Sequence, residues 1–178
     1  LKHPSFIKQC LEKASGKPLF LFLYFSKIHT VTVSDVLKKY EWNDKKFYEK
    51  KDENLKLYDN TFIEVGKYMK TFLDTLKELQ IYDNSIIIFF SDHGTGIGER
   101  FSERNYGSFT YEETIRTFHL FISKDIKKGR ISEKLRDTID IFPTILDLAK
   151  INSNLDRPGD SFAEFLLGNI SELREKDY

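Results

Sequence analysis

Cysteine is almost absent from this sequence of 178 residues, and neither sign of charge is in excess. The only cysteine, Cys10, excludes an intramolecular disulfide framework and favours a reducing, cytoplasmic compartment. The 28 basic residues equal the 28 acidic residues, so no bulk charge predicts binding to nucleic acid or to an anionic membrane surface. Any anion binding must therefore be local.

Long hydrophobic runs are missing as well. The most apolar early stretch, residues 19–25, is far shorter than the roughly 20 residues of a membrane-spanning helix, and no signal peptide is visible. The chain is therefore predicted to be soluble, without membrane contact. Its start at Leu1 rather than Met suggests that an N-terminal portion was removed or was never included. A hydrophobic content of 40% supports one globular domain with a substantial core.

Apolar runs and helical periodicity alternate along the chain. The run 85–91 predicts a strand buried on both faces, residues 19–25 predict a second buried strand, and residues 118–123 form a third apolar run. Residues 3–14 and 52–80 have helical spacing. This alternation predicts an α/β fold with mainly parallel strands. The stripe along the longer helix, read as core packing, consists of Tyr58, Phe62, Val65, Met69, Phe72, Leu76 and Leu79.

Two further segments have local signals. Residues 34–51 are rich in Lys, Asp, Tyr and Glu, which predicts an exposed, mobile excursion. Pro143 suits the first turn of a helix, and Asp140 is its expected cap.

Asp92 and His93 follow the central apolar run directly. The carboxyl end of a strand is where open α/β sheets bind ligands, and carboxylate and imidazole are both ligands for divalent metals. Adjacent side chains reach one metal only if the strand ends in a turn, and Gly94, Gly96 and Gly98 supply the freedom for one. The residues alone leave another interpretation open, in which Asp92 caps a turn and His93 hydrogen-bonds to it.

Three motifs together resemble the C-terminal half of a sulfatase domain of the alkaline phosphatase superfamily. They are IIIFFSDHGTGIGE, then YEETIR at residues 111–116, then DTIDIFPTILDLAKI at residues 137–151. The resemblance covers residues 17–168 and implies a three-layer sandwich with a mixed, mainly parallel sheet, here incomplete. It implies that residues 1–178 are the C-terminal part of one such domain.

The resemblance also implies roles for individual residues. Asp92 and His93 match a pair that binds a divalent cation, with Ca, Mn and Zn as candidates, beside the nucleophile. His29 matches a histidine that contacts the transferred group or its leaving oxygen, although the proline that often follows is absent. The lysine that many sulfatases place before the YEE segment is absent, so Arg100 or Arg104 is expected to replace it or the anion clamp is missing.

The nucleophile of such an enzyme is not found in the sequence. A sulfatase nucleophile lies in a Cys-x-Pro-x-Arg motif, whereas Cys10 is followed by Leu-Glu-Lys-Ala. The resemblance thus predicts a metal-dependent hydrolase of sulfate or phosphate esters, acting on an anionic ester and present here without its nucleophile. A phosphotransferase of the same superfamily and a noncatalytic structural or binding module are the alternatives. An incomplete sheet also leaves an unpaired edge, which predicts self-association.

Overall fold

The computed structural model describes residues 3–14, 16–31, 41, 44–104, 109–132, 134, 136–154, 156 and 158–174. The chain divides into two compact units. Unit 1 comprises residues 1–80 and 93–117, and unit 2 comprises residues 81–92 and 118–178. Nothing in the described part of the chain combines the length and apolar character that a membrane-crossing helix needs.

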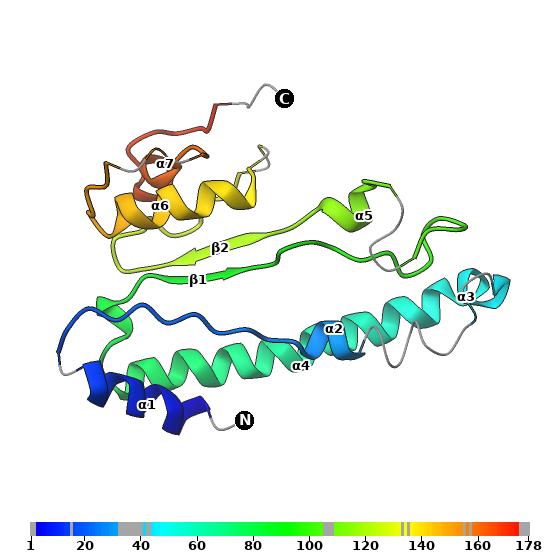
Figure 1. The fold of residues 1–178 in the computed structure, drawn as a ribbon, viewed down its shortest axis with the longest axis horizontal. Helices are drawn as coiled ribbons and strands as arrows, with labels where there is room; N and C mark the ends of the chain where they lie inside the picture. The colour runs from blue at the N-terminus through cyan, green and yellow to red at the C-terminus, as the bar shows by residue number, and fades with distance from the viewer. Residues whose placement is uncertain are drawn as a thin grey trace. The chain divides into compact units, whose positions relative to one another are not determined.

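Unit 1 is built around one long helix. Its described helices are α1 (His3–Ala14), α2 (Lys27–Val31), α3 (Lys45–Glu49), α4 (Lys51–Glu78) and α5 (Glu112–Ile115). Helices α1 and α2 lie beside α4 (Figure 1). The helices predicted over residues 3–14 and 52–80 are confirmed as α1 and α4.

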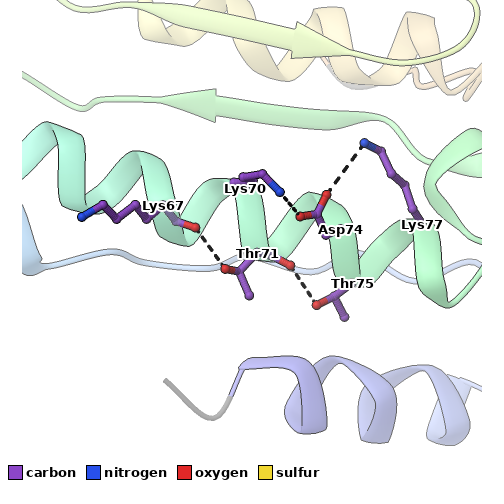
Figure 2. A network of polar contacts seen from close by, with 6 residues as sticks. All are labelled: Lys67, Lys70, Thr71, Asp74, Thr75 and Lys77. Carbon is purple, nitrogen blue, oxygen red and sulfur yellow. Dashed lines mark hydrogen bonds and ion pairs between the residues drawn. The ribbon is translucent and has the colours of Figure 1, made fainter.

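Helix α4 is amphipathic, with Val65 and Leu76 on its buried side. On its exposed side, Asp74 accepts a hydrogen bond from Lys70 at 2.5 Å and lies 4.0 Å from Lys77 (Figure 2). The bond from Lys70 lowers the pKa of the Asp74 carboxyl. Solvent screens such exposed pairs, so burial of the apolar side contributes most of the helix's stability.

The predicted excursion at residues 34–51 contains a folded part. Asp44 caps α3, because its carboxylate accepts a hydrogen bond from the Lys46 amide at 2.9 Å. Phe47 on this helix is fully buried. Residues 34–40, 42 and 43 lie outside the described part, and the mobility of this segment stays a prediction.

Unit 2 contains a two-stranded antiparallel sheet and short helices. The 3-10 helix η2 (Tyr82–Asn84) precedes β1 (Ile87–Phe90), which pairs with β2 (His119–Ile122) so that Ile87 faces Ile122 and Phe90 faces His119. The strand predicted at residues 85–91 and the apolar run at residues 118–123 thus both contain strands, but the two strands are antiparallel, so the predicted mainly parallel sheet is not confirmed. Burial alternates along β1, with Phe89 buried and Phe90 40% exposed. Ile88, on the opposite face from Phe89, is half-buried and packs beside its partner Phe121 against the core of unit 2, so the expected burial on both faces holds as far as Phe89 and fails at Phe90.

The strand predicted at residues 19–25 does not form in the described structure. The segment belongs to no sheet, and three aromatic side chains are largely exposed: Phe20 at 77%, Phe22 at 64% and Tyr24 at 70%. A strand is stabilised by hydrogen bonds to a neighbouring strand, and the described residues supply none here. High β-propensity alone does not create a strand.

The core of unit 2 lies where its C-terminal helices cover one side of the sheet (Figure 1). The chain continues from β2 through η3 (Thr138–Asp140), α6 (Ile141–Leu148) and α7 (Ala163–Leu167). The buried apolar side chains that pack together are Phe121, Ile141, Phe162, Phe165, Leu166 and Leu173.

Asp140 joins the beginning of α6 to the segment that precedes α7. Its fully buried carboxylate accepts hydrogen bonds from the amides of Asp137 at 3.2 Å and Asp160 at 2.8 Å. Its side chain does not cap α6, although Pro143 does lie in the first turn of that helix. Asp140 is thus the N-cap residue of α6 as expected, but its carboxylate makes no capping hydrogen bond because amides outside α6 engage it. Gly159 next to this contact has φ +92°, and a Cβ there would lie 2.5 Å from the Ile139 carbonyl oxygen.

Candidate functional site

The predicted cation ligands Asp92 and His93 follow β1 after a single intervening residue, Ser91. Both side chains are exposed, which makes them accessible to a ligand from solvent. Asp92 is the last residue of the first segment of unit 2, and His93 is the first residue of the second segment of unit 1. The chain leaves the strand at this point, as the sequence predicts.

The imidazole of His93 has a defined hydrogen bond. Its Nδ1 lies 2.6 Å from the carbonyl oxygen of Gly94. A carbonyl only accepts, so Nδ1 must carry the proton and donate it. The neutral ring then has its lone pair on Nε2, which is the form that coordinates a metal.

Gly94 anchors the turn to helix α5. Its amide donates to the Thr114 carbonyl at 2.9 Å, and a side chain at this position would collide with the carbonyl of Glu113. Glycine is therefore required at residue 94 for close approach of two backbones. Of the three glycines expected to give the turn its freedom, Gly98 has a positive φ, at +118°.

The rest of the glycine-rich loop packs against the beginning of α4. Ile97 is 2% exposed, and its amide donates to the Glu99 carboxylate at 2.7 Å. Asn54 on α4 is also 2% exposed, and its side-chain Nδ2 donates to the carbonyl of Ile97 at 3.4 Å. The sequence prediction missed Asn54. Its position four residues before Tyr58, in register with the apolar stripe, is the signal that could have found it.

The two arginines expected near an anion have different surroundings. Arg100 is half-exposed, its Nε lies 2.7 Å from the Glu113 carboxylate and its guanidinium lies 4.2 Å over the Tyr111 ring. Arg104 is 4% exposed and donates to the Glu41 carbonyl at 2.8 Å. Arg104 is thus held inside unit 1, whereas Arg100 lies at its surface beside α5.

His29 lies on a short helix rather than in a loop. It is exposed on α2, the helix that packs beside α4. Within the described residues, no three His, Cys, Asp or Glu side chains gather closely enough to hold a metal ion. Carboxylate and imidazole are both ligand types for divalent cations, and catalytic metal sites usually take three or more ligands from protein, so the cation role of Asp92 and His93 stays a prediction.

Comparison with known proteins shows the family. A family model described as Sulfatase matches residues 4–151. The chain belongs to the sulfatase family. The N-acetylglucosamine-6-O-sulfatase of Bacteroides thetaiotaomicron is 32% identical to this sulfatase-family chain over 112 residues, which cover 61% of the chain and 19% of that protein. The extracellular sulfatase SULF-1 homolog of Drosophila melanogaster is 29% identical over 100 residues, covering 56% of the chain and 9% of that protein.

Solved sulfatase structures are similar to this family member in fold. A putative sulfatase from Bacteroides thetaiotaomicron superposes with a TM-score of 0.61 at 25% identity, covering 73% of this chain and 28% of that one. A 2-O GAG sulfatase gives a TM-score of 0.63 at 20% identity, covering 91% and 37%. The chain is therefore similar to a part of the alkaline-phosphatase-like fold, and it spans well under half the length of these relatives.

Proposed function

We propose that this chain contributes part of the active site of a metal-dependent hydrolase of sulfate esters, with phosphate esters as the related substrate class. Sulfatase family membership over residues 4–151 supports the reaction class. The observation that carries the proposal is the hydrogen bond from His93 Nδ1 to the Gly94 carbonyl, because it gives the imidazole the form that a cation requires.

Asp92 and His93 are the proposed cation ligands in this chain. A bound divalent cation supplies Lewis acidity and charge neutralisation at an anionic ester. Carboxylate with imidazole suits Mn or Zn, and a shell completed mainly by oxygen suits Ca. The loop from Gly94 to Ile97, anchored to α5 and α4, orients His93 for this role.

Two further residues are proposed to act on the substrate. His29 protonates the leaving oxygen or stabilises its charge, a role for which an exposed imidazole is suited. Arg100 is the better of the two arginines for an anion contact, because its guanidinium is half-exposed and Arg104 is buried.

The nucleophile is proposed to come from a segment outside these 178 residues. Cys10 lies in α1 and is followed by Leu-Glu-Lys-Ala, which does not match the family's nucleophile motif. In the whole domain, we expect the sheet to extend into the mixed, mainly parallel, three-layer arrangement.

Calorimetric titration of Mn²⁺, Zn²⁺ and Ca²⁺ into the chain tests the cation role. We expect micromolar binding of at least one ion, corresponding to about 8 kcal/mol. The double variant Asp92→Ala, His93→Ala should lose it, whereas Asp125→Ala, which removes another exposed aspartate, should keep it. Equal binding by the chain and the double variant would refute the proposal.

A further inference from the structure

Asn54 is a buried polar residue that links three segments of unit 1. Its Nδ2 donates to the carbonyl of Phe47 at 3.0 Å, seven residues earlier in the chain. The same nitrogen donates to the carbonyl of Ile97 at 3.4 Å, 43 residues later. Asn54 thus joins α4 to α3 on one side and to the glycine-rich loop on the other.

The chemistry of this contact explains why the residue is an asparagine. A primary amide nitrogen carries two hydrogens, one for each carbonyl, and both carbonyls can only accept. An aspartate of the same shape would direct lone pairs at two carbonyl oxygens, and an apolar residue would leave both without this donor. Either change is costly because the amide is 2% exposed.

The loop held by Asn54 is also held at its other end. Ile97 is fixed by the Asn54 contact, and Gly94, three residues earlier, is fixed by its bond to the Thr114 carbonyl at 2.9 Å. The Gly94 carbonyl is the group that accepts from His93 Nδ1. Any rotation of the peptide after Gly94 would therefore move the acceptor that orients the imidazole.

We propose that Asn54 is a positioning residue for His93, which acts by holding the Ile97 end of the glycine-rich loop so that the Gly94 carbonyl keeps the His93 ring in its Nδ1-protonated form. The inference rests on the proposed role of His93 as a cation ligand. Asn54 itself does not touch the cation. It sets the affinity of His93 for the cation by holding the glycine-rich loop that carries the acceptor of the imidazole.

The test compares Asn54→Asp with Asn60→Asp. Asn60 lies six residues further along the same helix and is exposed, so the control makes the same chemical change without the buried contact. Imidazole ¹⁵N NMR reports the tautomer of His93 in the metal-free protein, and a Zn²⁺ titration reports affinity. We expect Asn54→Asp to mix the His93 tautomers and to weaken Zn²⁺ binding about ten-fold or more. Asn60→Asp should match the wild type in both measurements.

Unchanged His93 nitrogen shifts in a folded Asn54→Asp variant would overturn the inference. If that variant does not fold, hydrogen exchange in the wild-type chain decides instead. The side-chain amide hydrogens of Asn54 should then exchange much more slowly than those of Asn60, and equal exchange would overturn the inference. Absence of Zn²⁺ binding to the wild type would refute the cation role of His93 alone, because the tautomer and exchange measurements need no metal.

Discussion

His119 links the stability of unit 2 to pH through one half-buried imidazole. It lies at the beginning of β2, and its ring stacks on Phe162 with centroids 6.4 Å apart. Its Nε2 has no hydrogen-bond partner among the residues that the structure describes. Burial lowers the pKa of His119, and the nearby carboxylates of Asp140 and Asp137 only partly oppose that shift.

Acidification should therefore destabilise unit 2. The folded state favours neutral His119, so its contribution is complete above the unfolded pKa of about 6.5 and is lost as the pH falls from there through the lower folded pKa. Urea unfolding at a series of pH values should show this decline, and His119→Gln should flatten it. The exposed His29→Gln is the control and should keep the wild-type pH dependence. An identical pH dependence in wild type and His119→Gln would contradict the assignment.

The position of a residue can be predicted from the sequence more readily than its hydrogen-bond partners. The position of Asp92 and His93 just after a strand could be predicted because they follow a long apolar run, whereas their role as cation ligands stays a prediction. The roles of Asn54 and Asp140 could not be predicted, because each depends on amides or carbonyls that only the folded chain brings near. Periodicity places a side chain on a face, but it does not say which backbone group the side chain will meet.

At the scale of elements, helix α4 offers a direct test of backbone entropy. Gly66 is exposed in the middle of this helix, and a Cβ there would meet no atom within 4 Å. Gly66→Ala should raise the free energy of unfolding by about 0.5–1 kcal/mol, because alanine loses less conformational freedom in a helix. Denaturant unfolding measures the change.

Gly129→Ala is the matched control. A Cβ at residue 129 would also meet nothing within 4 Å, but its φ is +74°, a conformation that alanine adopts only with strain. This variant should be destabilised, so equal effects of the two substitutions would contradict the explanation.

Helices were easier to predict from this sequence than strand pairing. A helix satisfies its own backbone, so the pattern at residues 52–80 was enough to predict α4. A strand depends on a neighbour, and nothing in the runs 85–91 and 118–123 showed that they would pair with each other in antiparallel fashion. The run 19–25 lacks such a neighbour in the described structure.

For the whole molecule, the exposed run at residues 19–25 predicts self-association. It carries Phe20, Phe22 and Tyr24 largely exposed and contains no charged residue that would oppose edge-to-edge pairing. Light scattering should show oligomers of the wild-type chain, and Phe22→Lys should shift them toward monomer. Ile131→Lys is the control. Ile131 lies outside this run and is 86% exposed, so the same added charge there should leave the distribution of oligomers unchanged. A monodisperse wild-type monomer would contradict the prediction.

The contact between Asp140 and the amide of Asp160 also has a consequence for protein engineering. It joins the residue just before α6 to a residue shortly before α7, 20 positions later, so it closes a loop that contains α6 and most of the connection to α7. Once the ends of a loop are fixed, doubling its length costs only about 0.6 kcal/mol in closure entropy. The stretch at residues 152–154, which is outside both helices, is therefore a site where an epitope tag or a fluorescent reporter could be inserted while the helices on either side stay joined.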